Sequence, residues 1–583
     1  MKKKSLLLPC MFVAVVAMNT ACSDFFEQDS DHVIFADGDH LNNATDTIYS
    51  VTGILNKLQM LSDRTILLGE ARADLVDINQ KTSSDLRNVA LFNVGDSNQY
   101  NVPKDYYAVI NNCNYFIAKV DTALKNNRNE KIFESEYAAV KGIRAWTYLQ
   151  LAINYGKVPF VTEPILSKVD GEKKYPMADL HDICTYFIND IAPFVNVPMP
   201  SYGSIRNTDS RLFYFPIYVL LGDMNLWIGN YKEAALNYYK YINNRNGSNT
   251  FYTTGLNAAT WPRDINKYIS VSNLSYATNV FSDESFNTNS EIVTMIPGDS
   301  IRAEGNYSEL RNIFNSNDDN DYTASLNPSQ SMMNLSAAQI YCNRSTVGNI
   351  SYAPSNLTDN YSGDLRLSSV YSTQQGNYNK KTYQMQLIRK YATRNVHIYR
   401  RMGVYLRLAE ALNRAGLPQV SYAILKTGLN NEIIDTLKLS YPNDSTWLNQ
   451  LDFSNTLYAP RVRDINRANT IGIHSRGCGW TEYNDYYPFP DDSTLTGDAR
   501  LQYSIEKVED MIMDENALEM AFEGTRFYDL MRVALRRNDP SYLADRIYKR
   551  RGADKVNEVK SEIKKDLTDT KSWYLKWNGQ IGY

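Results

Sequence analysis

Apolar residues recur every three or four positions over much of the chain, a spacing that places them on one face of an α-helix. The pattern is clearest over residues 41–61, 105–124, 133–154 and 180–191. Glycine and proline end several of these stretches, as in Tyr155-Gly156-Lys157-Val158-Pro159. We therefore predict a mainly α fold with helices at these four positions.

Two further stretches predict antiparallel helix pairs. In the first, a helix over residues 211–228 is followed by Gly229-Asn230 and a partner over residues 231–242. In the second, a helix from Ile398 to Leu412 is followed by a return helix over residues 420–429. Both pairs resemble tetratricopeptide units, although they do not recur at a regular period. A plain core of αα-hairpins is the alternative, and the two interpretations differ little in what they imply for function.

The pattern changes between the predicted helices. Residues 249–395 and 432–503 are rich in Asn, Ser, Thr, Tyr and Gly, with only short alternating runs such as Glu291 to Ile296. Their aromatic content argues against disorder. We expect ordered surface loops that cover a helical frame formed mainly by residues 39–248, 396–431 and 504–540.

Composition and charge narrow the class of protein. The chain has 583 residues, of which 43% are apolar and 22% charged, and its formal net charge is -4. An acidic balance of this kind lacks the basic footprint of a nucleic-acid-binding protein. The 43 tyrosines contrast with only five histidines, so chemistry based on histidine clusters is disfavoured.

The N-terminus has the pattern of an export signal. Lys2 to Lys4 are followed by an apolar run from Leu6 to Met18, which is too short to span a membrane as a helix, and by Asn19-Thr20-Ala21-Cys22. This order predicts a signal peptide over residues 1–21. Cysteine after small residues resembles the lipobox of bacterial lipoproteins, although Asn19 departs from the usual leucine, and acylation of Cys22 would anchor the protein. The alternative is plain secretion with an incidental Cys22.

After the cysteine, residues 22–38 are polar and acidic and are expected to form a flexible tether. Residues 39–583 are expected to form one ligand-binding domain. Cys113, Cys184, Cys342 and Cys478 are far apart and no C-x-x-C motif occurs, so we expect buried thiols and no zinc site.

A search for catalytic and metal motifs is negative. The sequence has no G-x-x-x-x-G-K-[ST], H-E-x-x-H or G-x-S-x-G motif, and adjacency of His474 and Ser475 does not make a triad. Asn315, Asn317, Asp319 and Asp321 alternate as calcium ligands do, but the glycine of the EF-hand is missing. A solvated polar loop is the favoured interpretation, and we expect no catalytic residue, metal or cofactor.

Charged residues recur at helical spacing near the C-terminus. Glu519, Glu523, Arg526, Asp529 and Arg532 are separated by four, three, three and three positions, which predicts a charged stripe on one helix. An acid/base pair of Glu519 and Glu523 is the catalytic alternative. Glycosidase carboxylates flank the scissile bond from two sides, about 5 to 9.5 Å apart, which neighbours on one helix cannot do. The stripe therefore indicates structural salt bridges.

Residues 518–532 resemble the signature near the C-terminus of the SusD/RagB-like family, the surface lipoproteins of Bacteroidetes nutrient-uptake systems. Other segments agree with the family in order and spacing: Cys22-Ser23-Asp24-Phe25-Phe26, Arg144-Ala145 with Tyr155-Gly156-Lys157-Val158-Pro159-Phe160, Gly229-Asn230-Tyr231, Gly363-Asp364-Leu365-Arg366, Tyr399-Arg400 with Leu408-Ala409-Glu410-Ala411-Leu412, and Gly472-Ile473-His474-Ser475-Arg476-Gly477. Asn19 departs from the pattern, as does Trp573-Tyr574-Leu575, which lacks the full proline-rich ending.

The resemblance implies tetratricopeptide-like helix pairs in a right-handed superhelical frame, covered by long irregular loops with a few short strands. It also implies a protein anchored by lipid to the outer membrane and facing the cell exterior. Such proteins cap a SusC-like TonB-dependent transporter and hand it an oligosaccharide or a peptide, without cleaving it and without a cofactor. A surface glycoside hydrolase and an adhesive or scaffold lipoprotein that binds protein partners through its helix pairs are the alternatives.

The sequence context of the tryptophans separates core positions from candidate ligand contacts. Trp146 and Trp227 lie in predicted helices, Trp447 precedes Leu448 and Leu451 at helical spacing, and Trp573 and Trp577 lie in a tail expected to dock on the body. Trp480, with Tyr483, and secondarily Trp261 lie in polar irregular segments. An exposed aromatic face suits stacking on a sugar ring or a peptide side chain, so we predict that these three residues line the capture site. The alternative is that they hold their loops in place.

The lipid anchor can be tested directly. If Cys22 is the acylated N-terminus, Cys22→Ala should release the protein from the membrane fraction into the soluble fraction, because the acyl chains supply the membrane affinity. Detergent partitioning of membranes from cells that express each form measures this. A variant that stays in the membrane as firmly as the parent would contradict the prediction.

Overall fold

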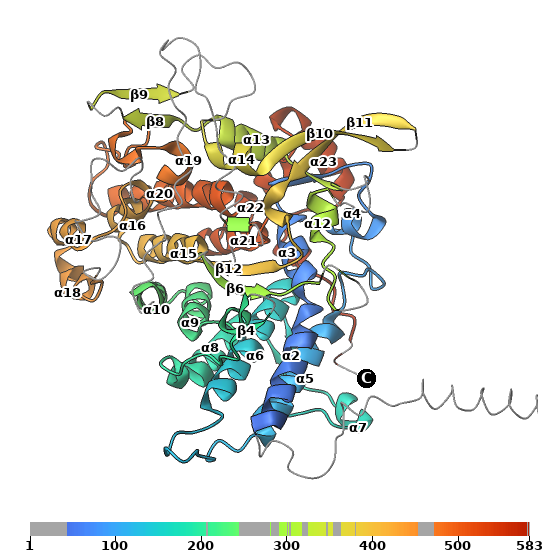
Figure 1. The fold of residues 1–583 in the computed structure, drawn as a ribbon. Coiled ribbons are helices and arrows are strands. Elements are labelled where there is room, and N and C mark those ends of the chain that lie inside the picture. Colours follow the sequence, from blue (N-terminus) through green and yellow to red (C-terminus); the bar gives the residue numbers. More distant parts are fainter. Residues whose placement is uncertain are drawn as a thin grey trace, which may run out of the picture.

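The structure is a computed structural model. It describes residues 44–581 except for 206–207, 244–279, 282–290, 300, 302–304, 317–323, 345–347, 354–362, 379, 453–471 and 580. Within these residues the fold is mainly α, with helices stacked in layers and pairs of short strands between and around them (Figure 1). The predicted fold class is confirmed.

The first part of the frame is a row of helices in which each packs on the next. Its members are α2 (Ala44–Gln59), α5 (Pro103–Lys119), α6 (Glu134–Tyr155), α8 (Leu180–Ile191), α9 (Ile217–Trp227) and α10 (Tyr231–Asn243). α6 ends where Gly156 adopts a φ of 77°, as the Gly-Pro punctuation predicts. The four helices expected from periodicity are thus confirmed, with ends shifted by a few residues and with residues 41–43 outside the described part of the chain.

The first predicted helix pair is present, but its first helix is shorter than expected. Residues 210–213 form the 3₁₀ turn η3 (Ser210–Phe213), and α9 starts only after Pro216, because proline lacks the N–H that a helix interior needs. α9 and α10 then approach closely, since a Cβ at Gly222 would lie 2.4 Å from the Tyr238 ring. The Tyr238 hydroxyl donates to Asp223 across the pair at 2.6 Å.

The second predicted pair is also present, but the prediction that Ile398 begins a helix is wrong. Residues 396–400 form β12 (Val396–Arg400), and the helix is α15 (Arg401–Arg414), followed by α16 (Pro418–Lys426). β12 pairs antiparallel with the fully buried β6 (Ile292–Ile296). Pairing with a distant strand overrides the local periodicity, because it satisfies the backbone groups of a buried segment.

The C-terminal helices contradict the single charged helix expected through Arg532. α20 (Gly497–Met520) ends and α21 (Arg526–Arg537) begins after a sharp turn in which Phe522 and Gly524 have φ values of 71° and 81°. Buried Glu70, at the end of α3 (Ser62–Glu70), accepts the backbone N–H groups of both residues, at 2.9 and 3.0 Å. A Cβ at Gly69 would lie 1.7 Å from the Gly524 carbonyl oxygen. Tertiary contact with α3 therefore fixes the turn, which helical spacing alone does not reveal.

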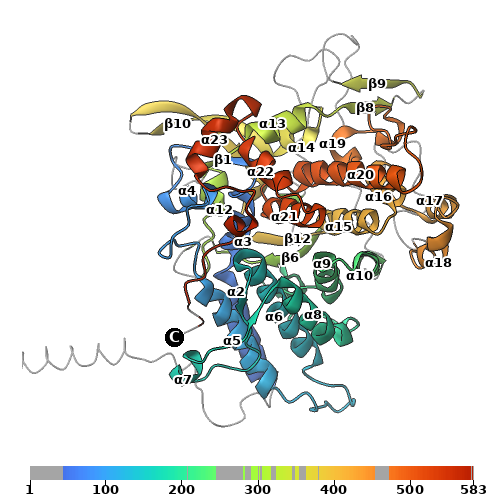
Figure 2. The same ribbon diagram turned by 180° about the vertical axis from the view of Figure 1, so that it is seen from behind.

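Short elements cover the frame, as expected of the loop-rich regions, and several of them, among them β8, β9, β10, α13 and α14, lie at one end of the molecule (Figure 2). The strands pair antiparallel in twos: β1 (Val76–Ile78) with β7 (Leu326–Pro328), β2 (Val158–Pro159) with β3 (Met177–Ala178), β4 (Ser204–Ile205) with β5 (Thr208–Asp209), β8 (Tyr341–Arg344) with β9 (Ile350–Ala353), and β10 (Tyr371–Tyr378) with β11 (Lys381–Ile388). The remaining helices and 3₁₀ turns are α4 (Ser84–Ala90), α7 (Lys168–Gly171), η2 (Ala192–Phe194), α12 (Leu310–Phe314), α13 (Gln330–Ala337), α14 (Leu365–Val370), η6 (Arg389–Tyr391), α17 (Asn431–Leu437), η7 (Pro442–Asp444), α18 (Ser445–Leu448), α19 (Ser475–Cys478), η9 (Thr481–Tyr483), α22 (Ser541–Tyr548), η10 (Ala553–Lys555), α23 (Val556–Ile563) and η11 (Thr570–Trp573).

One continuous hydrophobic core runs from α2 to the C-terminal tail. The tail docks on this core, as predicted: Trp573 is buried and donates to the Leu567 carbonyl at 2.8 Å, and Trp577 packs edge-on against Tyr107 and Tyr155. Among the described residues, none of the helices combines the length and the apolar composition needed to cross a membrane.

A buried ion-pair network joins the loop regions to α20. Glu519, in the last turn of α20, contacts Arg366, Arg400 and Arg476 at 3.1, 3.2 and 3.2 Å. Glu515, one turn earlier, pairs with Arg366 at 2.6 Å. All of these side chains are buried, and the three guanidinium groups hold the pKa of Glu519 well below its usual range despite that burial.

Further acidic residues neutralise the outer sides of the arginines. Glu291 pairs with both Arg400 and Arg476 at 2.8 Å, and Glu523 pairs with Arg400 and Lys390 at 2.6 Å. The stripe residues thus form salt bridges, as predicted, but mainly with segments distant in sequence. A buried, ionised Glu519 cannot act as a general acid, so the structure gives no support to the catalytic alternative.

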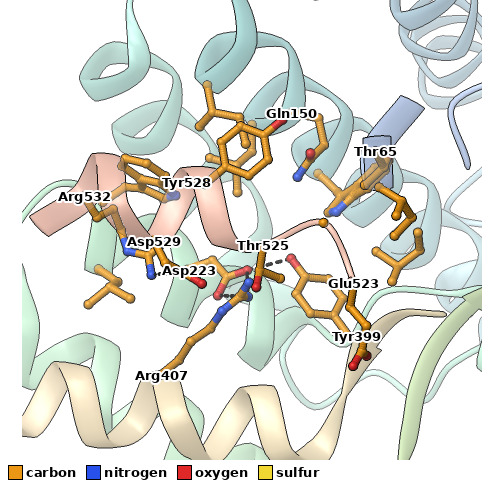
Figure 3. A pocket seen from close by; sticks show the side chains of 18 residues that line it. Thr65, Gln150, Asp223, Tyr399, Arg407, Glu523, Thr525, Tyr528, Asp529 and Arg532 are labelled. Atoms are coloured by element: carbon orange, nitrogen blue, oxygen red, sulfur yellow. Dashed lines mark hydrogen bonds and ion pairs between the residues drawn. The ribbon is translucent and has the colours of Figure 1, made fainter. Parts of the chain in front are cut away.

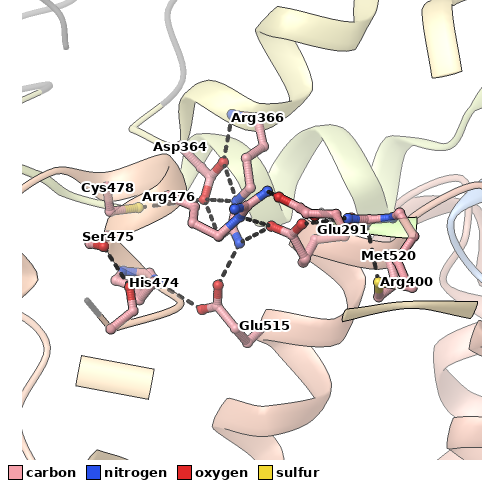
Figure 4. A network of polar contacts seen from close by, with 12 residues as sticks. Glu291, Asp364, Arg366, Arg400, His474, Ser475, Arg476, Cys478, Glu515 and Met520 are labelled. Atoms are coloured by element: carbon pink, nitrogen blue, oxygen red, sulfur yellow. Dashed lines mark hydrogen bonds and ion pairs between the residues drawn. The ribbon is translucent and has the colours of Figure 1, made fainter. Parts of the chain in front are cut away.

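The same network also fixes the position of residues 474–478. The carboxylate of Asp364 pairs with Arg366 at 2.6 Å (Figure 4). It also lies so close to Gly477 that a Cβ on that residue would be only 2.3 Å from it. His474 contacts Glu515 at 2.7 Å through Nδ1 and stacks on Tyr487. Residues 474–478 are therefore held rigidly against α20, and they carry the loop that begins at Gly479.

Ala409 tests the pairing of α15 with its neighbours. This residue is fully buried on α15, which packs on α10, α16 and α20. Ala409→Asp would bury an unpaired carboxylate and should lower the free energy of unfolding by several kcal/mol. Chemical denaturation measures the loss, with Ala337→Asp, at an exposed alanine of α13, as the matched control. Equal stability of the two variants would contradict the packing.

Glu519 tests the network. Glu519→Gln removes the charge that three buried arginines share and should cost about 3 to 5 kcal/mol, whereas Glu506→Gln, at an exposed position of the same helix, should be nearly neutral. Because folding lowers the pKa of Glu519 from 4.5, its contribution is complete above that pH and is lost in acid. The stabilities of parent and variant should therefore converge as the pH falls below about 4. Denaturation at neutral and acidic pH measures both effects, and a constant difference would show that Glu519 is not the titrating group.

Candidate ligand-binding site

A small cavity lies among α6, α9 and α21 (Figure 3). Its polar wall is built around Asp223, which accepts from Tyr399 at 2.6 Å and from Arg407 at 2.7 Å. The volume is about 50 Å³, which is room for one or two water molecules but not for a sugar ring. This cavity therefore belongs to the polar packing of the frame.

A larger cavity of about 410 Å³ lies between α2, η3 and β6. Leu55, Phe213 and Met295 line its apolar side, and Gln59 and Asn306 contribute amide groups. Its volume falls in the range of small-molecule sites. It is a second place where the fold could hold part of a ligand, although no sequence pattern singles it out.

The predicted ligand contacts Trp480 and Tyr483 lie at η9, which packs on β8. Figure 1 shows the β8–β9 hairpin near α19 at one end of the molecule. Their ring centroids are 6.1 Å apart, with the planes tilted by 55°. Both side chains are half-buried. Arg344, at the end of β8, places its guanidinium carbon 5.7 Å from the Trp480 centroid and 4.6 Å from that of Tyr483. The guanidinium of Arg344 thus contacts both the Trp480 ring and the Tyr483 ring.

Backbone contacts with β8 position this loop. The Trp480 N–H donates to the Cys342 carbonyl at 2.8 Å, and the Asn484 side chain donates to the Ile340 carbonyl at 2.9 Å. Gly479 makes the approach possible, because it has a φ of 73° and a Cβ there would lie 2.3 Å from the Cys342 oxygen. The direction of Trp480 is therefore set by the hairpin and by the rigid segment before it.

A second aromatic pair extends the surface. Tyr352, on β9, lies edge-on to Tyr486 with centroids 4.8 Å apart, and Tyr486 is 62% exposed. The Tyr352 hydroxyl donates to the Tyr483 carbonyl at 3.3 Å and to the Asp485 carboxylate at 3.2 Å. We call Arg344, Tyr352, Trp480, Tyr483 and Tyr486 the aromatic surface.

Sequence reasoning missed two members of this surface. Arg344 and Tyr352 lie more than 120 positions before Trp480, and no local pattern connects the hairpin to the loop. Tyr487, close to Trp480 in sequence, turns inward and stacks on Tyr422 and His474. The two adjacent tyrosines Tyr486 and Tyr487 point in opposite directions, one to the surface and one inward, and an alternating pattern of this kind is the one sequence signal that could distinguish them.

The other tryptophans follow their predicted classes where the structure describes them. Trp146 is fully buried, Trp227 is partly buried against the core, and Trp447 packs beside the buried Leu448 and Leu451. Trp261 and Cys22 lie outside the described residues, so their predicted roles stay predictions.

The structure offers no catalytic arrangement around His474 and Ser475. Buried Ser475 donates its hydroxyl to the Gly472 carbonyl, while His474 contacts Glu515. In the part of the chain with described coordinates, no cluster of three His, Cys, Asp or Glu side chains could hold a metal ion. Cys113, Cys184, Cys342 and Cys478 are buried thiols, and burial raises the pKa of Cys113 to about 12.

Comparison with solved structures finds the same fold in several proteins. A SusD superfamily protein from Bacteroides vulgatus is 17% identical, with 92% of this chain and 95% of that chain covered and a TM-score of 0.55. A SusD-like carbohydrate-binding protein from Bacteroides vulgatus is 15% identical, with 84% and 83% covered and a TM-score of 0.51. A SusD-like carbohydrate-binding protein from Bacteroides fragilis is 13% identical, with 86% and 89% covered and a TM-score of 0.51.

At the sequence level, residues 477–577 match the profile of the SusD family. This segment runs from α19 through the broken α20–α21 helix pair to the docked tail. A comparison with curated protein sequences finds no match. The chain therefore has the SusD fold over nearly its whole length, and its resemblance to the SusD/RagB-like family is confirmed.

Proposed function

We propose that this protein is a surface nutrient-binding lipoprotein. It captures an oligosaccharide or a peptide outside the cell and delivers it to a SusC-like TonB-dependent transporter in the outer membrane. The observation that carries the proposal is the SusD fold, which the chain shares with proteins described as carbohydrate-binding. The likeness in sequence is low, so the ligand must be argued from the side chains of this chain.

The aromatic surface supports a binding role for Trp480 and Tyr483. Flat rings with polar edges stack on the apolar face of a sugar or on a peptide side chain. The surface is partly exposed and rests on the rigid segment at residues 474–478, so a ligand would meet rings that are already oriented. Trp261 is a secondary candidate for the same site.

The domain organisation fits this role. Residues 1–21 act as the signal peptide, and residues 22–38 tether a single ligand-binding domain over residues 39–583 to the acylated Cys22. The continuous core from α2 to the tail supports a single domain. The protein binds its ligand without cleaving it, and in support of this the carboxylates of the signature segment are engaged in buried ion pairs.

Trp480 tests the site once a glycan array and a parallel peptide screen have supplied a ligand. Trp480→Ala should weaken binding by roughly 1 to 3 kcal/mol, as an exposed aromatic hot spot does, with the melting temperature nearly unchanged. Trp447→Ala, at a half-buried tryptophan of α18, is the matched control and should bind as the parent does. Titration calorimetry and thermal unfolding measure the two effects.

Two results would contradict this site. A large loss of stability in Trp480→Ala would make the residue structural. Unchanged affinity in Trp480→Ala, together with weakened binding in Phe213→Ala, would move the ligand to the cavity between α2, η3 and β6.

A further inference from the structure

Arg344 differs in its surroundings from the arginines of the buried network. Arg366 and Arg476 are engaged by carboxylates at 2.6 and 2.8 Å. Within the described part of the chain, the Arg344 guanidinium instead has the rings of Trp480 and Tyr483 as its contacts and no ion-pair partner. Asp485, an acidic residue of the facing loop, accepts instead from the Tyr352 hydroxyl at 3.2 Å.

The position of this guanidinium leaves its hydrogen-bond donors available. Cation–π contact uses the flat face of the guanidinium carbon and leaves the N–H groups at its rim. Arg344 is half-buried and lies beside rings that limit its movement. A planar fork of donors that is already oriented binds the two oxygens of a carboxylate or sulfate in parallel, and loses little entropy in doing so.

The neighbouring rings specify what should carry that anion. Trp480 and Tyr483 offer apolar surface directly beside the guanidinium, with 4.6 Å between the Arg344 carbon and the Tyr483 centroid. A sugar ring that bears a carboxylate or a sulfate presents a C–H face and an oxyanion at a similar separation. We propose that Arg344 recognises the carboxylate or sulfate of an acidic glycan whose sugar ring packs on Trp480 and Tyr483. This proposal rests on the proposed function and names the class of nutrient.

Titration calorimetry of the mature chain tests the proposal with four probes in EDTA: an oligogalacturonide, a carrageenan oligosaccharide that carries sulfate but no carboxylate, a neutral maltooligosaccharide and a polyglutamate peptide. At least one acidic glycan should bind ten-fold or more tightly than the neutral one. Arg344→Gln should lower the affinity for that glycan at least ten-fold and leave the melting temperature of the protein unchanged. Arg344→Lys should recover only part of the affinity, because it keeps the charge but loses the fork. Arg128→Gln, at an exposed arginine outside the aromatic surface, should bind as the parent does.

The probes distinguish a carboxylate from a sulfate as the anion, and they distinguish failure of the role of Arg344 from failure of the proposed function. Binding of oligogalacturonide identifies a carboxylate, and binding of the carrageenan oligosaccharide alone identifies a sulfate. If a neutral glycan binds as tightly as the acidic ones and Arg344→Gln binds it as the parent does, the role of Arg344 is overturned while the proposed function stands. Binding of polyglutamate but of no glycan also overturns it. If no glycan or peptide binds, on this panel or on the wider screens, the proposed function falls as well.

Discussion

The interaction on which the rest of the structure depends is the sharing of Glu519 by Arg366, Arg400 and Arg476. Each arginine comes from a different segment, and all four groups are removed from water. Removing charges from water costs free energy, so the network is stable only when all of these segments are in place. The network thus links α14, β12 and α19 to the end of α20. If any one of these segments is misplaced, a buried charge loses its partner.

The same region explains how an irregular loop can hold the aromatic surface in a defined position. Asp364 and Glu515 hold residues 474–478 against α20, and Gly479 then lets the chain pass close to β8. Trp480 therefore leaves a rigid base and meets Arg344 from the hairpin. The backbone at Trp480 is held by its hydrogen bond to the hairpin before any ligand arrives, and such preorganisation lowers the entropy cost of binding.

Binding, and not cleavage, is the chemistry that these features support. Glu519 and Glu523, the acid/base pair of the catalytic alternative, are buried in ion pairs with Arg400, whereas the described residues of the aromatic surface present rings and a guanidinium. The cavity between α2, η3 and β6, which is partly open to solvent, adds a second space of about 410 Å³ that could hold part of a ligand. Capture of a ligand on rings and a cation, as we propose, needs no acid or base.

The sequence by itself determined the mainly α class, the helices with strong periodicity such as α5, α6 and α8, the export signal as a prediction, and Trp480 with Tyr483 as neighbours on the surface. These follow from spacing within one segment, where side chains a few positions apart meet whatever the rest of the chain does. The tertiary structure alone decided that Ile398 lies on a strand, that the stripe breaks at Phe522, and that Arg344 joins Trp480. Each of these depends on a partner more than 100 positions away, such as β6, Glu70 or the β8–β9 hairpin, and the energy of such a contact is absent from any local pattern.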